Sequence, residues 1–272
     1  MNKNIQEGID IIKTDDKRLI SVNNKHQNYV DTNNYENPYL FYTTIDNYPV
    51  YSIFKRENTK DKIDANPLIN ALKQRRGWEF VNAKKDLLKL LRNFVSAAKL
   101  LPKYDTIIMT PSNNQLNKIV FNYLIRLIEH DKEYENFFEK LSAQDVYNNL
   151  IDDNFINNKF VNPNRVWNDI DDAFAQMEEF NDGIFSYKYL QKSKYRNIII
   201  QSMKINANIY NEILFDNTIN KKDILIFDDT ITTGKTISDS GQAIKSMFIP
   251  NSITYITLFS AIDGDIKQIK YE

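Results

Sequence analysis

Residues 222–236 read Lys-Asp-Ile-Leu-Ile-Phe-Asp-Asp-Thr-Ile-Thr-Thr-Gly-Lys-Thr, and this stretch decides the fold. Its apolar run, residues 224–227, is too short for a helix and has charged residues on both sides, which is typical of a strand buried on both faces. Asp228 and Asp229 follow, and a loop rich in hydroxyl groups leads into an amphipathic helix. This order of strand, polar loop and helix predicts an α/β unit.

The polar groups of this stretch predict a particular chemistry. The carboxyl end of a buried parallel strand opens on the crevice where α/β proteins bind ligands. Adjacent carboxylates there can accept hydrogen bonds from vicinal sugar hydroxyls, or hold Mg²⁺ through water. Backbone N–H groups, hydroxyls and a lysine at a helix N-terminus form a phosphate site. The stretch therefore predicts a ribose 5-phosphate site, with phosphate bound by Thr230, Thr232, Thr233, Gly234, Lys235 and Thr236.

Two other interpretations of the same residues involve nucleotide hydrolysis. Gly234-Lys235-Thr236 could end a Walker A loop, but that motif requires glycine at the position of Asp229. The apolar run with its two acids could be a Walker B strand, but no G-x-x-x-x-G-K-[ST] sequence lies upstream. A P-loop NTPase is therefore a third hypothesis, and measurable ATP hydrolysis that depends on Lys235 would support it.

The stretch closely resembles the phosphoribosyl pyrophosphate (PRPP) motif of type I phosphoribosyltransferases, in which four apolar residues precede two acids and a Thr/Ser/Gly loop. The resemblance implies that Asp228 and Asp229 bind the ribose hydroxyls and that residues 232–236 bind the 5-phosphate. It also implies Mg²⁺ as the cofactor, carried by PRPP with no direct protein site of its own, and with Asp228 and Asp229 as candidate contacts.

A second strand and loop precede this motif. Residues 104–109 indicate a buried strand, and Thr110, Pro111, Ser112 and Asn113 follow it. The loop after the first core strand binds pyrophosphate through its backbone in type I phosphoribosyltransferases, so the resemblance assigns pyrophosphate to these four residues. An ordinary turn between a strand and a helix explains the same sequence equally well.

Basic residues gather after a predicted strand at residues 184–190. A mobile basic loop that closes over departing pyrophosphate would stabilise the transition state. A solvated basic turn is the competing interpretation. The residues concerned are Lys188, Lys192, Lys194 and Arg196.

Shorter pieces resemble the ComF-like branch of the same superfamily, whose proteins are linked to competence and DNA uptake. These pieces are Tyr48-Pro49-Val50 with Leu72-Lys73, residues 107–111, Phe121-Asn122, and Lys204 with Asn206 or Asn208. Ile119-Val120 replace the Arg-Gly of that branch, the second proline of its first loop is absent, and its cysteine-based zinc ribbon cannot exist here. On this resemblance Lys73 joins Asp228 and Asp229 as a catalytic residue that helps to hold pyrophosphate.

Composition limits the function classes. The chain has 272 residues, of which 42% are hydrophobic and 26% charged, and its formal net charge is −1. This charge gives no general electrostatic argument for nucleic acid, although a nucleic-acid or protein partner and a homodimer remain expectations to test. The absence of cysteine excludes disulfides and thiolate chemistry. No apolar run is long enough to span a membrane, so a cytoplasmic protein without membrane contact is expected.

The expected architecture is one α/β domain, a mostly parallel sheet with helices on both faces. Residues 1–37 form a polar N-terminal extension, and residues 38–272 form the domain, with a helical insertion at about 131–182. A hairpin is expected in residues 38–54 with its turn at Asp46-Asn47, a helix at 198–214, and a last strand at 252–260.

Two functions follow from these observations. The leading hypothesis is a Mg²⁺-dependent phosphoribosyltransferase, an enzyme of the glycosyltransferase class, which transfers ribose 5-phosphate from PRPP to an unidentified base in nucleotide metabolism. The alternative is a non-catalytic protein of this fold that senses PRPP or a similar nucleotide, in DNA uptake or bacterial defence. The missing Arg-Gly weakens the catalytic assignment and therefore favours the alternative. A chain can keep the fold of a family without its activity, because fold alone does not determine function.

Overall fold

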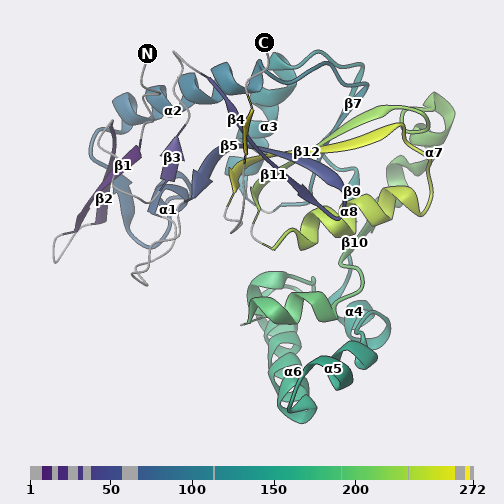
Figure 1. The fold of residues 1–272 in the computed structure, drawn as a ribbon. Coiled ribbons are helices and arrows are strands. Elements are labelled where there is room, and N and C mark those ends of the chain that lie inside the picture. The colour runs from purple at the N-terminus through teal and green to yellow at the C-terminus, as the bar shows by residue number, and fades with distance from the viewer. Residues whose placement is uncertain are drawn as a thin grey trace.

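The computed structural model of the chain describes residues 8–13, 18–23, 30–32, 38–56, 67–112, 114–190, 192–231, 233–260 and 267–269. An eight-stranded sheet forms its centre (Figure 1). Seven of its strands follow one another in the order β13 (Lys267–Ile269), β4 (Leu40–Ile45), β5 (Tyr48–Arg56), β12 (Ser252–Ser260), β11 (Asp223–Ile231), β7 (Thr106–Met109) and β8 (Lys132–Tyr134). The eighth strand, β3 (Val30–Thr32), pairs with β5. The five strands β5, β12, β11, β7 and β8 run parallel to one another, whereas β3, β4 and β13 pair in antiparallel fashion. The prediction of an α/β fold with a mostly parallel sheet is confirmed.

Strand β11 shows why the sheet has helices on both faces. Leu225 and Phe227 belong to one buried hydrophobic cluster, whereas Ile224 and Ile226 belong to another on the opposite face. Successive side chains of a strand point to opposite faces, so a continuous apolar run requires a cover on each side. The first cluster contains residues of α1 (Pro67–Leu72), α2 (Ala83–Ala98) and α3 (Gln115–Leu127), and the second contains residues of α7 (Ala207–Asp216) and α8 (Lys235–Lys245).

The predicted hairpin is formed by β4 and β5. Ile45 pairs with Tyr48 across the turn, and the two turn residues, Asp46 and Asn47, have φ angles of 49° and 66°. A two-residue turn with both central φ angles positive matches the right-handed twist of the strands, and asparagine and aspartate tolerate this conformation best. A strand at 252–260 is confirmed as β12, but it is not the last one, because β13 follows it.

The predicted N-terminal extension contains three strands within its described residues. β1 (Gly8–Lys13) and β2 (Arg18–Asn23) form an antiparallel pair, and β6 (Trp78–Phe80) joins β2 in a parallel arrangement. Ile20 and Val22 of β2 are buried in the same hydrophobic cluster as Trp78. The extension therefore packs against the main domain through β2, and β3 adds a strand to the main sheet.

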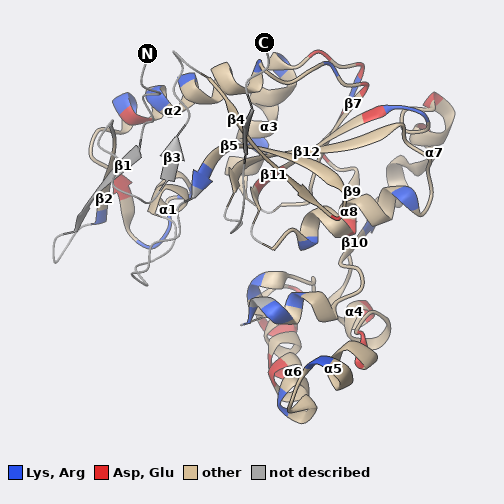
Figure 2. Ribbon diagram, viewed as in Figure 1, with Lys and Arg blue, Asp and Glu red and all other residues tan. Residues whose placement is uncertain are grey.

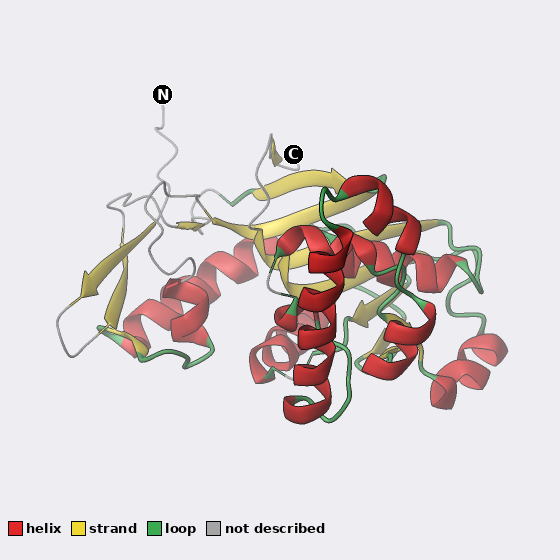
Figure 3. Cartoon of the chain, turned by 90° about the horizontal axis from the view of Figure 1, so that it is seen from below, coloured by secondary structure: helices red, strands yellow, loops and turns green. Residues whose placement is uncertain are grey.

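A helical lobe, residues 141–200, projects from the sheet on a neck of two antiparallel strands, β9 (Phe138–Lys140) and β10 (Met203–Ile205) (Figure 1). The lobe has a hydrophobic core of its own, which includes Ile156, Ile170 and Met177. Figure 3 views the molecule from below, with the helices of the lobe in front of the sheet. The elements of the lobe are α4 (Ala143–Asn149), α5 (Asp153–Lys159), α6 (Pro163–Phe180), and the 3₁₀ helices η1 (Tyr187–Tyr189) and η2 (Ser193–Ile198).

Three sequence expectations differ from the structure around this lobe. Residues 131–182 are not helical throughout, because β8 extends the main sheet and β9 belongs to the neck. The predicted strand at 184–190 is wrong: Phe185 and Leu190 are buried in the core of the lobe, and η1 lies between them. The helix predicted at 198–214 begins only at α7, where the Asn206 side chain accepts a hydrogen bond from the Asn208 amide and caps it.

Charged residues of both signs are interspersed along the helices of the lobe (Figure 2). Among the residues that the structure describes, no helix is long and apolar enough to span a membrane.

Candidate functional site

Two loops meet at the carboxyl edge of the parallel sheet. Strand β11 includes both predicted carboxylates, Asp228 and Asp229. The preceding residue, Phe227, pairs with Met109 at the end of β7, and the Thr110 amide donates a 2.9 Å hydrogen bond to the Phe227 carbonyl. The loop after β7 therefore lies beside the carboxylates of β11, at the edge where α/β sheets bind ligands.

Asp228 is an aspartate in an unfavourable environment for its charge. It accepts hydrogen bonds from the Thr110 hydroxyl and from the Asp229 amide, the latter at 2.8 Å. Burial and, after it, the negative charge of Asp229 raise the pKa of Asp228 from 3.8 to about 7, although these two hydrogen bonds and the positive charge of Lys73 act in the opposite direction. The ionised carboxylate would therefore gain from a ligand that brings hydroxyl donors or a cation.

Asp229 is held by two side chains from other elements. Its Oδ2 lies 2.5 Å from the Lys73 ammonium and 3.1 Å from the Asn114 amide nitrogen. Lys73 follows α1 directly, and its backbone amide continues the helix by donating to Ile69. The structure thus brings predicted catalytic Lys73 to the predicted carboxylates across 156 residues of sequence. This ion pair orients the Asp229 carboxylate.

The predicted phosphate loop leads into α8 through Gly234. This residue has φ 78°, and an added Cβ would lie 2.7 Å from the Ile45 side chain, so both conformation and space require glycine. The side chain of Thr233 is exposed, whereas the hydroxyl of Thr230 is buried and has no hydrogen-bond partner among the described residues. Thr232 lies outside the described residues.

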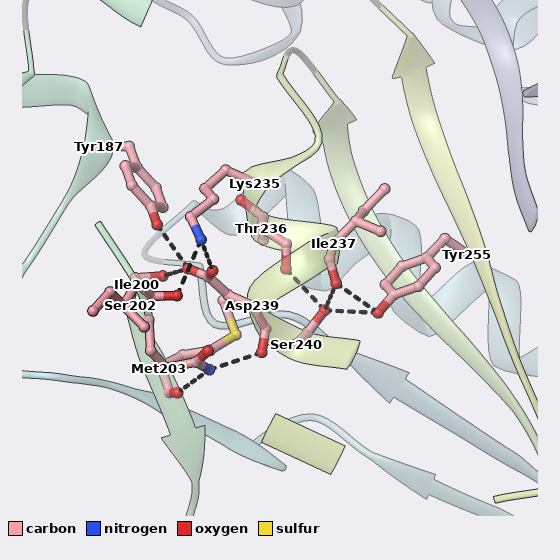
Figure 4. A network of polar contacts seen from close by, with 11 residues as sticks. Tyr187, Ile200, Ser202, Met203, Lys235, Thr236, Ile237, Asp239, Ser240 and Tyr255 are labelled. Carbon is pink, nitrogen blue, oxygen red and sulfur yellow. Dashed lines mark hydrogen bonds and ion pairs between the residues drawn. The ribbon is translucent and has the colours of Figure 1, made fainter. Parts of the chain in front are cut away.

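Lys235 does not point toward the carboxylates of β11. Its ammonium lies 2.7 Å from Oδ1 of Asp239, one turn later in α8, and 3.1 Å from the carbonyl of Ile200 in the lobe (Figure 4). Asp239 is fully buried and also accepts hydrogen bonds from the hydroxyls of Tyr187 and Ser202. Lys235 thus belongs to a polar network that attaches α8 to the lobe. Burial and the charge of Asp239 raise the pKa of Tyr187, which keeps its hydroxyl a donor.

One cavity of about 180 Å³ lies between the strand ends and the lobe. It brings together predicted residues from three separate parts of the sequence: the motif, the loop after β7 and the basic segment. Asn113 lies outside the described residues. The lining residues are Thr110, Pro111, Ser112, Lys140, Phe185, Ser186, Tyr187, Lys188, Ser202, Met203, Asp228 and Thr236.

Only Lys188 of the predicted basic loop lines this cavity. Lys192 forms a 2.6 Å ion pair with Asp169 of α6, and the Lys194 ammonium lies 4.9 Å from the ring centroid of Phe160. Arg196 is half-buried, and burial lowers its pKa. These three side chains are therefore held within the lobe, where Lys192 and Lys194 contribute to its own packing.

Sequence reasoning missed the wall of the cavity that the neck and lobe provide. Lys140 comes from β9 and Met203 from β10. Tyr187 comes from η1 of the lobe, and Ser202 from the segment between the lobe and β10. Burial lowers the pKa of Lys140, while the charges of Asp228 and Asp229 raise it and that of Lys188 lowers it further. The signal in the sequence was weak: Phe138 and Lys140 are two residues apart, so a strand over these residues places the lysine on the same face as a hydrophobic residue.

The residues at this edge suit Mg²⁺, which the resemblance implies. Magnesium prefers carboxylate and phosphate oxygens, and Asp228 offers a carboxylate whose pKa stays raised by burial and by Asp229, although the charge of Lys73 acts in the opposite direction. Asp228 and Asp229 are the residues that would contact it. Among the described residues no group of three or more His, Asp or Glu side chains is placed to hold a metal ion.

Comparison of the chain with protein-family models, with curated proteins and with solved structures finds no significant match.

Proposed function

We propose that this chain binds PRPP with Mg²⁺ and transfers its ribose 5-phosphate to a base that is not yet identified. One observation carries the proposal: Asp228 and Thr236 of the motif line the same cavity as Thr110, Pro111 and Ser112. Carboxylates near two anion-binding loops suit a sugar that is flanked by a phosphate and a diphosphate, and the shared cavity supports this assignment.

Each part of the ligand has a corresponding part of the site. The carboxylates of Asp228 and Asp229 accept hydrogen bonds from the ribose hydroxyls. The backbone N–H groups at the start of α8, after Gly234, bind the 5-phosphate at the positive end of the helix dipole. The backbone and hydroxyl groups of Thr110 and Ser112 bind the diphosphate. Lys73 keeps Asp229 in position through their ion pair.

The reaction exchanges one bond at ribose C1 for another. The bond from C1 to the diphosphate oxygen breaks, a nitrogen of the base forms a bond to C1, the diphosphate leaves with the electron pair, and the nitrogen loses its proton. Positive charge develops on the ribose ring in the transition state, so the protein mainly positions the groups and compensates charge. When bound, Mg²⁺ neutralises part of the diphosphate charge.

The test is calorimetric titration with PRPP in the presence and absence of Mg²⁺, with ribose 5-phosphate and ATP as comparison ligands. The double variant Asp228→Asn/Asp229→Asn removes the charge of two hydrogen-bond acceptors and is expected to weaken PRPP binding by about 100-fold or more. Asp172→Asn, which changes an exposed aspartate on α6, is the matched control and should bind as the unmodified protein does. A folded double variant with unchanged affinity would remove the ribose assignment.

A second candidate, a non-catalytic sensor of PRPP or a nucleotide, is favoured by the position of Lys235. Its ammonium is committed to Asp239 and to the Ile200 carbonyl, so the loop would bind phosphate through backbone amides alone. Pyrophosphate release separates the two functions. A transferase releases pyrophosphate when PRPP and a suitable base are both present, whereas a sensor binds PRPP with the same Asp228 dependence and no turnover.

A further inference from the structure

The neck that carries the lobe has one residue that does not match its surroundings. Lys140 pairs with Met203, and Phe138 pairs with Ile205, in the antiparallel ladder between β9 and β10. Phe138, Met203 and Ile205 are all buried hydrophobic residues of one cluster. Residues two apart on a strand share a face, so Lys140 occupies an inward-facing position at which its neighbours are apolar.

The contacts of Lys140 within the described residues are also unusual. It forms no hydrogen bond or ion pair with any residue in the described part of the chain. The lysine on the opposite face of the same neck differs, since Lys204 lies 3.0 Å from Glu139 across the ladder. The half-buried ammonium of Lys140 loses hydration, and the charges of Asp228 and Asp229 favour it without outweighing this cost, so burial still lowers its pKa. A residue of this kind is expected where a ligand supplies an anion in direct contact.

The surroundings of Lys140 identify which part of a ligand it would meet. It lines the cavity together with Thr110, Pro111 and Ser112, the residues after β7. The charged groups that face it are Asp228 and Asp229 from β11 and Lys188 from η1. The start of α8, to which the 5-phosphate is assigned, contributes Thr236 to the same cavity. The neighbouring Lys235 forms an ion pair with Asp239.

We propose that Lys140 binds the diphosphate of PRPP in the cavity that it lines together with Thr110 and Ser112. This inference rests on the proposed function, and it adds a residue from the neck to a site otherwise built from strand ends. The diphosphate carries the largest negative charge of the ligand and would lie near the carboxylates of Asp228 and Asp229, so a lysine beside it would offset repulsion that Mg²⁺ neutralises only in part. The hydrogen-bonded ladder of β9 and β10 fixes the Lys140 backbone, whereas Lys188 is exposed and lies over the Tyr189 ring, 4.6 Å from its centroid.

The experiment measures binding of inorganic pyrophosphate, PRPP and ribose 5-phosphate, each with Mg²⁺, to the full chain and three variants. Lys140→Met removes the charge at similar volume, Lys140→Arg keeps the charge, and Lys159→Met changes an exposed lysine of α5 as the control. Lys140→Met should weaken pyrophosphate and PRPP about 10-fold to 100-fold, as expected for a hydrogen bond to a charged group. Ribose 5-phosphate binding should be unchanged, and Lys140→Arg should restore most of the pyrophosphate affinity.

The pH dependence gives a second readout that a structural role would not produce. Pyrophosphate affinity should fall as Lys140 loses its proton, at a pH below the ordinary lysine value of 10.5 because burial lowers its pKa. This decline should disappear in Lys140→Met. Circular dichroism of each variant confirms folding before binding is compared.

The outcomes separate the two ideas. Unchanged pyrophosphate affinity in a folded Lys140→Met would overturn the Lys140 assignment and leave the proposed function intact. Equal losses for ribose 5-phosphate and pyrophosphate would also overturn it, since Lys140 would then support the whole site. Binding of pyrophosphate that depends on Lys140, without binding of PRPP or ribose 5-phosphate, would retain the anion site and reject the proposed function. If the unmodified chain binds neither pyrophosphate nor PRPP, both proposals are wrong.

Discussion

Replacing Asp228 by asparagine should stabilise the fold while it weakens ligand binding. Burial and the neighbouring Asp229 charge raise the Asp228 pKa from 3.8 to about 7. Between these two pH values the folded chain binds more protons than the unfolded chain, so the free energy of unfolding falls as pH rises through this window. Asparagine keeps the shape of the side chain and removes this loss.

The magnitude follows from the same pKa values. At 1.36 kcal/mol per pKa unit, the difference between 3.8 and about 7 gives an upper bound of about 4 kcal/mol. The gain from Asp228→Asn should be close to zero at pH 4 and should approach this bound above pH 7. Such a cost is expected of a binding residue, because its environment favours the complex with ligand rather than the empty site.

Urea unfolding of the unmodified chain and of Asp228→Asn at pH 4, 5.5, 7 and 8 measures this effect. Asp172→Asn, which makes the same substitution at an exposed position of α6, is the control for the chemical change itself. Two results would refute the argument that the Asp228 charge is unfavourable in the folded state. One is an Asp228→Asn variant that is less stable than the unmodified chain at pH 8, and the other is a stability difference between them that does not change with pH.

Three further predictions concern the loop, the polar network and the basic segment. Gly234→Ala should destabilise the fold by about 1–2 kcal/mol or more in urea unfolding, because a φ of 78° disfavours a side chain and the new Cβ would meet Ile45. An unchanged unfolding midpoint would contradict this. Asp239→Ala should lower the free energy of unfolding by about 3–5 kcal/mol in the same assay, because it leaves the Lys235 side chain, 13% exposed, without its carboxylate partner. A loss below about 1 kcal/mol would show that the network does not hold α8 to the lobe. Lys192→Met should leave PRPP affinity unchanged in calorimetry, since this side chain contacts the lobe rather than the cavity; a large loss would restore it to the ligand site.

The sequence by itself determined the elements whose signals are local. Asp46 and Asn47 adopt the positive φ angles of a tight hairpin turn, which both residue types tolerate without help from distant contacts. The short apolar run before Asp228 indicates a strand that is covered on both faces, which is typical of an α/β fold. The two acids follow this run directly, so the sequence also placed them at the carboxyl end of the strand.

Only the tertiary structure decided the contacts of those residues. Lys73 reaches Asp229 across 156 residues, and Lys235, which stands in a phosphate motif, binds Asp239 and the lobe instead of facing the cavity. Lys140 belongs to the cavity because β9 pairs with β10 beyond the intervening lobe. Local propensity sets backbone conformation within a few residues, whereas the partner of a charged side chain depends on which distant segments the folded core brings within a few ångströms. The sequence therefore predicted the strand end where the site lies, and the packing of the lobe against it determined the residues that complete the cavity.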